Sequence, residues 1–291
     1  MRMLDRLGLE ETVVVITGGG TGLGLAMVRA LARAGASLCI AGRRSGPIEE
    51  AANEVIGLGS DAIAVPTDVS ESSQVDRLIS TAVDHFGHID VLINNAALVS
   101  SNIRKPIWDI DDSEWQQALD VNLSGAFYCS RSAAKVMSEQ NRGKIINVAS
   151  GFGLRGGRDI YMYCCTKGGV IQLTRVLSFS LARYGITANS IVPGFIPTEA
   201  TNSDIRETLP PSGDFLPTGK LGIPEDLGPV AVFLSSSASD YMTGEMIIVD
   251  GGGLASGVSP AGHAPLIPLE ISYFPNILAR RQKCRFFRNT I

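Results

Sequence analysis

The chain has 291 residues, of which 45% are hydrophobic and 19% charged, which is enough for one globular α/β domain with a sizeable core. Its formal net charge of -4 gives no reason to expect nucleic acid or an anionic membrane surface as the main partner. No apolar run approaches the roughly 20 residues that a membrane-spanning helix needs, and the N-terminus lacks the apolar region of a signal peptide.

Short aliphatic runs alternate with amphipathic stretches through the first 250 residues or so. The runs predict seven strands, at 12–17, 37–42, 63–68, 90–96, 143–150, 186–194 and 245–252. The stretches between them predict helices over 22–35, 47–58, 72–86, 112–137, 162–184 and 225–236. Continuously aliphatic strands are typical of a parallel sheet that is covered on both faces. We therefore predict an α/β fold: one Rossmann-type, doubly wound domain over residues 1–253.

Two segments interrupt this alternation. Residues 195–224 are rich in Pro, Thr, Ser and Gly and follow a strand end, where a lid or substrate loop would lie. Residues 254–291 follow the last predicted strand and end in a basic stretch, so we treat them as a C-terminal extension of unknown role. It could wrap a neighbouring subunit, reshape a substrate cleft or be a loosely held appendage.

The cysteines and histidines indicate a reducing compartment. The five cysteines are scattered and form no CxxC pair, which favours reduced thiols and a cytoplasmic location over a disulfide framework. The three histidines form no ligand cluster with them, so we expect no metal site. Cys164 and Cys165 are adjacent, and we expect both to pack on helix neighbours as small apolar residues.

The stretch "TGGGTGLG", residues 17–24, follows a predicted strand and opens a predicted helix. Glycines in that position let backbone N–H groups approach a pyrophosphate at the positive end of the helix. The context of strand, turn and helix predicts a dinucleotide-binding loop.

A second stretch, "DIYMYCCTKGG" at residues 159–169, contains two tyrosines and a lysine. Residues four apart share one face of a helix, so Lys167 lies one turn from Tyr163 and Tyr161 lies one turn from Cys165. Only Tyr163 has a lysine beside it, and we expect Tyr161 to pack or to line a cleft entrance.

With these motifs the chain resembles the short-chain dehydrogenase/reductase family over roughly residues 8–253. The resemblance lies in the order and spacing of TGxxxGxG at 17–24, "TDVS" at 67–70, "NNAA" at 94–97, Asn122, Ser150, Tyr163-x-x-x-Lys167 and "PGFIPT" at 193–198. It implies an oxidoreductase that interconverts a carbonyl and a secondary alcohol with NAD(P)(H).

The resemblance also implies roles for individual residues. Tyr163 would be the catalytic acid/base, Ser150 would orient the substrate oxygen, Lys167 would hold the nicotinamide ribose, and Asn122 would hold a water for proton relay. A free tyrosine has a pKa near 10, and a neighbouring ammonium together with an oxidised nicotinamide would lower it. The implied cofactor-binding residues are Gly18, Thr21, Gly22, Leu23, Gly24, Arg43, Arg44, Asp68, Val69, Asn95, Ala96, Tyr163, Lys167, Pro193, Gly194, Ile196 and Thr198.

Two positions bear on the cofactor. The second strand ends in "AGRRS" without the carboxylate that would bind ribose hydroxyls, and Arg43 and Arg44 follow at once. A guanidinium suits a 2′-phosphate, so we favour NADP(H), although NAD(H) would tolerate one stacked and one solvated arginine. Ala97 stands where the family usually has glycine, which would tighten the site or require a changed turn.

Substrate and assembly stay open at this point. Members of similar pattern reduce 3-oxoacyl groups on acyl carrier protein, oxidise sugars or sugar acids, or act on steroids and small ketones. A catalytically silent NADP-binding regulator is the alternative from another class, although it would often have lost Ser, Tyr or Lys. The family favours a homotetramer, with a homodimer as the alternative, held by the helices around Asn122 and Tyr163. Trp108 and Trp115 are expected in the core or an interface.

Overall fold

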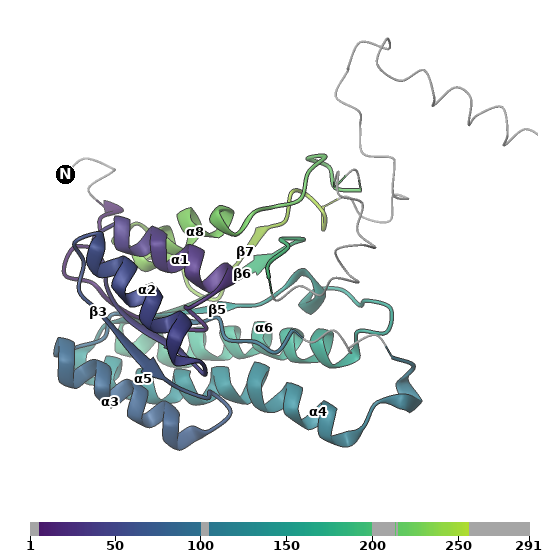
Figure 1. Cartoon of the computed structure of the whole chain (residues 1–291), viewed down its shortest axis with the longest axis horizontal. Helices are drawn as coiled ribbons and strands as arrows, with labels where there is room; N and C mark the ends of the chain where they lie inside the picture. The colour runs from purple at the N-terminus through teal and green to yellow at the C-terminus, as the bar shows by residue number, and fades with distance from the viewer. Residues whose placement is uncertain (1–5, 100–104, 200–212, 214, 256–291) are drawn as a thin grey trace, which may run out of the picture.

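The computed structural model describes residues 6–99, 105–199, 213 and 215–255, and these form one parallel sheet between two layers of helices (Figure 1). The sheet has seven strands in the order β3-β2-β1-β4-β5-β6-β7. Their bounds are β1 Val13–Thr17, β2 Ser37–Gly42, β3 Ala62–Pro66, β4 Val91–Asn94, β5 Gly143–Val148, β6 Ile186–Pro193 and β7 Met246–Val249. All seven predicted strands are confirmed, with ends shifted by a few residues.

The direction in which strands are added reverses between β1 and β4. The chain runs outward from β1 to β2 and β3, then returns to place β4 on the other side of β1. In an open α/β sheet such a reversal leaves a crevice at the carboxyl ends of the two strands, where ligands bind. The topology therefore fixes where the site must lie.

The helices pack on both faces because strand residues alternate between them. Val14 and Ile16 of β1 belong to a core shared with α1, α2 and α8, whereas Val15 belongs to the opposite core with α3 and α5. The helices are α1 Gly22–Arg33, α2 Ser45–Gly57, α3 Ser72–Phe86, α4 Asp112–Leu119, α5 Gly125–Gln140, α6 Tyr161–Leu181 and α8 Gly228–Ser235. Within the described ranges, no helix is long and apolar enough to cross a membrane.

The single helix predicted over 112–137 is wrong in one respect. A π-helical turn, η4 (Asp120–Ser124), separates α4 from α5, and it contains Asn122. The Asn122 side chain is buried, and its Oδ1 accepts a hydrogen bond from the backbone N–H of Leu98 at 2.6 Å. Such single π turns often occur at functional sites, and here the turn carries a predicted site residue.

Two other helix ends also differ from the prediction. The predicted helix over 225–236 begins as a 3₁₀ turn, Pro224–Leu227, before α8. The helix predicted to 184 ends as α-helix at Leu181 and closes with a 3₁₀ turn, Ala182–Tyr184.

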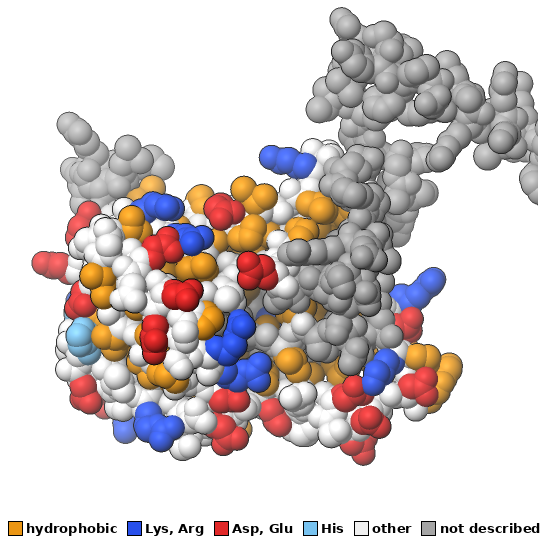
Figure 2. All heavy atoms as spheres, in the orientation of Figure 1, with side chains coloured by type: hydrophobic (Ala, Val, Ile, Leu, Met, Phe, Trp, Pro, Cys, Tyr) orange, Lys and Arg blue, Asp and Glu red, His pale blue; other side chains and the backbone are white. Residues whose placement is uncertain are grey.

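On the face shown in Figure 2, acidic and basic side chains are interspersed, in keeping with the small net charge.

A buried polar network joins the strands just below the crevice. Asn147 of β5 accepts from Nδ2 of Asn94 on β4 at 2.8 Å and donates to Thr174 Oγ1 of α6 at 2.8 Å. Asn94 also donates to Ser130 of α5, and Ser190 of β6 donates to Thr174. Because each bond lies in the interior, the network holds the ends of the central strands and the helix α6 in one register.

Replacing Asn147 with Ala tests this network. The change leaves Asn94 Nδ2 and Thr174 short of a partner, so we expect the free energy of unfolding to fall by about 2–3 kcal/mol. Urea unfolding followed by circular dichroism measures the loss. The control is Asn53→Ala on the exposed side of α2, which should stay within about 0.5 kcal/mol of wild type. Equal effects of the two changes would contradict the role of the network.

Candidate active site

A cleft of about 300 Å³ opens at the carboxyl ends of the central strands, where the topology places the crevice. It brings together most of the residues predicted from the motifs. Those lining it are Gly18, Thr21, Gly22, Leu23, Gly24, Asn95, Ala96, Ser150, Tyr163, Lys167, Pro193, Gly194, Ile196 and Thr198. Arg43, Arg44, Asp68, Val69 and Asn122 are not among its lining residues.

The glycine loop is shaped by close approaches that no side chain would permit. Gly18 and Gly22 have positive φ angles of 65° and 55°. A Cβ on Gly24 would collide with the carbonyl oxygen of Gly18. The loop thus places the first turn of α1, with its unpaired N–H groups, against the cleft, as a bound pyrophosphate requires. The residues present therefore fit a dinucleotide.

The loop is tied to β4 through Thr17 and Asn95. The Thr17 hydroxyl accepts from the backbone N–H groups of Asn95 and Ala96, both at 3.1 Å. The Asn95 amide donates to the carbonyl oxygens of Thr17 and Gly18 at 3.0 Å each. The side chain of Asn95 therefore fixes the shape of the glycine loop, and Asn95 and Ala96 both line the cleft.

Ala97 causes no backbone strain. Among the described residues, positive φ angles outside glycine occur at Glu11, Asn141 and Asp159, and Ala97 is not one of them. A methyl group is therefore compatible with the conformation there. Ala97 lines the cleft, and the two outcomes expected from the sequence, a tighter site or a changed turn, stay predictions.

Ser150, Tyr163 and Lys167 meet on the side of the cleft opposite the glycine loop. Ser150 follows β5 and lies beside Tyr163, which α6 presents from its first turn. Lys167 Nζ lies 5.7 Å from the centroid of the Tyr163 ring. The predicted pairing of Tyr163 with the lysine one turn away is confirmed.

Lys167 also links α6 to β5. Its ammonium group is buried and donates to the carbonyl oxygen of Val148 at 2.7 Å. The close approach depends on Gly153, because a Cβ there would lie 2.7 Å from the Lys167 carbonyl group. The lysine therefore positions the helix that carries Tyr163 against the strand end that carries Ser150.

Burial shifts the pKa of both groups. Burial raises the pKa of Tyr163, and the interaction with Ser150 opposes the rise. Burial lowers the pKa of Lys167 to about 8. In the protein alone, desolvation of the Tyr163 phenolate thus outweighs its polar contacts. The lowering expected from the sequence applies to the complex with oxidised nicotinamide and stays a prediction.

Asn122 lies behind the cleft. Its Nδ2 donates to Thr166 Oγ1 at 3.3 Å, and Thr166 is the residue next to Lys167. This places Asn122 close to the lysine but leaves its part in a proton relay as a prediction.

The residues predicted to bind the adenine and its ribose lie along the neighbouring strand ends. Arg43 and Arg44 are exposed between β2 and α2. Asp68 follows β3, and its Oδ1 accepts from the backbone and hydroxyl of Ser70 at 3.0 and 2.7 Å. Val69 is buried. Asp68 therefore also shapes its own turn, and the cofactor contacts of these four residues stay predictions.

One expectation about other side chains is wrong. Cys164 is partly buried beside Tyr163, but Cys165 is exposed and does not pack as a small apolar residue. Trp108 is 82% exposed and Trp115 is 38% exposed, so of the two expected places, core or interface, the core does not apply and an interface stays a prediction.

Several residues that line the cleft were missed. The largest are Phe152 and Phe195, and the others are Val99, Val148, Ala149, Ile160 and Pro197. Phe152 contacts Tyr163 and Phe195 edge-to-face, with ring centroids 6.4 and 6.2 Å apart. Their position directly after Ser150-Gly151 and Gly194 was the available signal, because residues that follow site motifs at strand ends share the cleft.

Comparison with known proteins agrees with this geometry. Residues 18–253 match the family model described as "Enoyl-(Acyl carrier protein) reductase". The chain is 37% identical over 258 residues to 2-dehydro-3-deoxy-D-gluconate 5-dehydrogenase of Escherichia coli (strain K12), covering 87% of this chain and 99% of that protein. The chain belongs to the short-chain dehydrogenase/reductase family. It is therefore a nicotinamide-dependent oxidoreductase.

Two further relatives of this short-chain dehydrogenase/reductase show the range of substrates. The 3-oxoacyl-[acyl-carrier-protein] reductase of Synechocystis sp. (strain ATCC 27184 / PCC 6803 / Kazusa) is 35% identical, covering 84% of this chain and 97% of its own. The crystal structure of a gluconate 5-dehydrogenase from Burkholderia cenocepacia J2315, in complex with NADP and tartrate, is 34% identical. It has a TM-score of 0.82 and covers 87% of this chain and 99% of its own.

The lowered pKa of Lys167 predicts a pH dependence of stability. Between about pH 8 and its ordinary value of 10.5, the unfolded chain holds the lysine proton more tightly than the folded protein. The free energy of unfolding therefore rises with pH through this window, by up to about 3 kcal/mol. The raised pKa of Tyr163 makes the free energy of unfolding fall as the pH rises, but only above the ordinary tyrosine value of 10.0.

Urea unfolding between about pH 7.5 and 10 measures this effect. We expect wild type to gain stability relative to Lys167→Met over the range, and to keep a constant difference from Lys135→Met on the exposed side of α5. Parallel curves for wild type and Lys167→Met would show that burial does not perturb this lysine.

Proposed function

We propose that this protein is an NADP(H)-dependent oxidoreductase that interconverts a carbonyl and a secondary alcohol, with Tyr163 as the acid/base. The observation that carries the proposal is that Ser150, Tyr163 and Lys167 line the same cleft as the glycine loop, with Lys167 Nζ 5.7 Å from the centroid of the Tyr163 ring. Side chains that meet at one wall of a dinucleotide cleft can act on a group held beside the nicotinamide.

The cofactor would supply a hydride to the carbonyl carbon. Ser150 would donate a hydrogen bond to the carbonyl oxygen, and Tyr163 would give that oxygen its proton. The burial that raises the pKa of Tyr163 keeps the phenol protonated at neutral pH, which suits it to donate in the direction of reduction. Lys167, whose pKa is lowered to about 8, would bind the nicotinamide ribose and return a proton to Tyr163.

The choice of NADP(H) over NAD(H) is supported by charge. Arg43 and Arg44 are exposed where β2 ends, beside the switch point of the sheet, and the strand end has no carboxylate. A solved relative, the gluconate 5-dehydrogenase, contains NADP. NAD(H) is the alternative, since one stacked arginine would tolerate it.

The relatives favour a sugar acid or a similar small oxo compound as substrate. Two of those compared here are named for sugar-acid dehydrogenation. Reduction of 3-oxoacyl groups on acyl carrier protein is the second candidate, supported by the Synechocystis relative and by the description of the family model. A silent NADP-binding regulator is disfavoured, because Ser150, Tyr163 and Lys167 are all present and line one cleft.

We also propose a homotetramer, or a homodimer, that is held through α5 and α6. Phe127 of α5, and Val176 and Phe179 of α6, are large exposed hydrophobic residues, and Phe179 is 91% exposed. Solvent exposure of such residues on neighbouring helices supports an interface there. Free thiols at the four cysteines of the described ranges support a cytoplasmic location.

The division into a catalytic domain over 1–253 and an extension over 254–291 also stays a proposal. The family match ends at residue 253, which supports this boundary. Residues 256–291 lie outside the described residues.

Tyr163→Phe tests the mechanism. Loss of the phenolic proton should lower kcat roughly 10²- to 10⁴-fold, while the affinity for NADPH stays within about threefold. Steady-state oxidation of NADPH measures kcat with carbonyl compounds that include 5-oxo sugar acids and 3-oxoacyl thioesters. Fluorescence titration measures the affinity for NADPH. Tyr161→Phe, two residues earlier in α6, should retain wild-type turnover. Equal turnover by wild type and Tyr163→Phe would contradict the assignment.

Arg43→Ala and Arg44→Ala test the choice of cofactor. Removing a guanidinium that binds the 2′-phosphate should raise the KM for NADPH roughly 10- to 100-fold and leave the KM for NADH nearly unchanged. Arg77→Ala, on the exposed side of α3, serves as the matched control. A wild-type preference for NADH, or the same change for both cofactors, would rule out this use of the arginines.

A further inference from the structure

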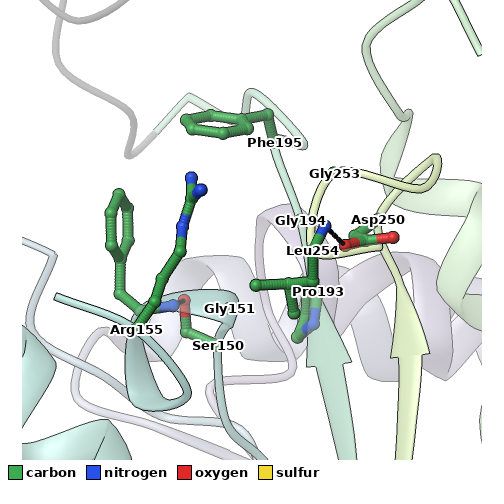
Figure 3. Close-up of a pocket in the computed structure, with 10 residues that line it drawn as sticks. Ser150, Gly151, Arg155, Pro193, Gly194, Phe195, Asp250, Gly253 and Leu254 are labelled. Atoms are coloured by element: carbon green, nitrogen blue, oxygen red, sulfur yellow. Dashed lines mark hydrogen bonds between the residues drawn. The ribbon is translucent and has the colours of Figure 1, made fainter. Parts of the chain in front are cut away.

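A small recess adjoins the cleft beside Ser150 (Figure 3). It lies between the loop that follows β5, the end of β6 and the turn that follows β7. Phe152, Phe195 and Leu254 give it an apolar wall, and Arg155 brings a cation to it. Because Ser150 lines both the recess and the cleft, a substrate held at Ser150 would extend one substituent into the recess.

The recess has room for only a small group. Its volume is about 40 Å³, whereas one water-sized group needs on the order of 10–15 Å³ by the same measure. It therefore accepts a group of about three non-hydrogen atoms, which is the size of a carboxylate. A long acyl chain would have to leave the site by another path.

Two charged side chains line the recess, Arg155 and Asp250, and within the described residues the guanidinium of Arg155 takes part in no ion pair. The guanidinium of Arg155 lies over the ring of Phe152, 5.9 Å from its centroid, and Figure 3 shows its side chain extending toward Phe195.

The other charged residue of the recess, Asp250, is already engaged. Its Oδ1 accepts from the backbone N–H of Gly252 at 2.8 Å, and its Oδ2 accepts from that of Leu254 at 2.7 Å. These bonds hold the turn after β7 and leave Arg155 as the group in the recess that is available to a ligand.

We propose that Arg155 binds a carboxylate of the substrate, and that the substrate is therefore a short oxo acid, or the corresponding hydroxy acid, with its reacting carbon at Ser150. The inference rests on the proposed function and names its substrate class. A guanidinium presents two parallel N–H groups that match a carboxylate. The phenyl ring under Arg155 restricts where the guanidinium can lie, so less freedom is lost when the acid binds.

Turnover of matched pairs tests the proposal. The pairs are 4-oxopentanoate with its methyl ester and 2-oxobutanoate with its methyl ester, because esterification removes the charge and keeps the ketone. We expect wild type to prefer the acids, and Arg155→Met to lower kcat/KM for the acids roughly 10- to 100-fold while the esters change less than about twofold. Arg155→Lys should recover part of the preference.

Arg158→Met is the control, because Arg158 is exposed three residues later in the same loop and does not line the recess. It should leave the preference for acids as in wild type. A loss of the preference in Arg158→Met, or an equal effect of Arg155→Met on acids and esters, would overturn the proposal.

A binding experiment separates this proposal from the catalytic one. Calorimetry with NADPH-loaded Tyr163→Phe protein measures the affinity for 4-oxopentanoate without turnover, and the double variant Tyr163→Phe/Arg155→Met should bind it roughly 10- to 100-fold more weakly. Binding that depends on Arg155, with no turnover by wild type, would refute the proposed function and support the recess. Turnover by wild type, with acid binding that is absent or independent of Arg155, would support the proposed function and refute the role of the recess.

Discussion

The buried hydrogen bond from Lys167 Nζ to the carbonyl oxygen of Val148 holds together the strand end before Ser150 and the helix that carries Tyr163. Val148 is the last residue of β5, two positions before Ser150, and Lys167 lies one turn after Tyr163 on α6. A cation buried at this point costs free energy unless it is well bonded, which explains why its pKa falls to about 8. The same contact sets the distance between Ser150 and Tyr163, and it leaves a lysine that can exchange a proton near neutral pH.

The opposite wall depends on the absence of side chains. Gly18 and Gly24 lie so close that any Cβ on Gly24 would displace the loop, and Asn95 fastens the loop to β4. Gly22 touches Thr198 of the segment after β6, where a Cβ would lie 3.3 Å from the Thr198 side chain. The cleft is thus bounded by strand ends and a helix start, and the lining residues from β1, β4, β5 and β6 keep their positions because the sheet fixes them.

Sequence patterns predicted those parts of the molecule that follow from periodicity and local spacing. The seven strands, the glycine loop and the pair Tyr163–Lys167 belong to this class, since each depends on residues close together in the chain. The π turn at Asn122 was missed, because a single inserted residue scarcely changes helical periodicity. The recess at Arg155 was missed because three segments far apart in sequence form it.

The pKa of Tyr163 also depends on the fold, and local sequence spacing does not predict that dependence. Lys167 and an oxidised nicotinamide together predict a lowered value in the complex, whereas in the protein alone the loss of hydration within the fold raises the pKa. The bound cofactor would add a positive charge beside the phenol when oxidised. Tyr163 would then be an acid with reduced cofactor and a better base with oxidised cofactor, which suits a reversible enzyme and has no use in a silent regulator.

Transfer of deuterium from NADPH labelled at C4 tests the central claim most directly. Wild-type protein is incubated with labelled NADPH and a small oxo acid, and the product alcohol is examined by NMR. The account predicts deuterium on the carbinol carbon with wild type and little or none with Tyr163→Phe in the same time. NADPH binding without label in any product, over a panel that includes oxo acids, sugar acids and 3-oxoacyl thioesters, would contradict the account and favour the regulator.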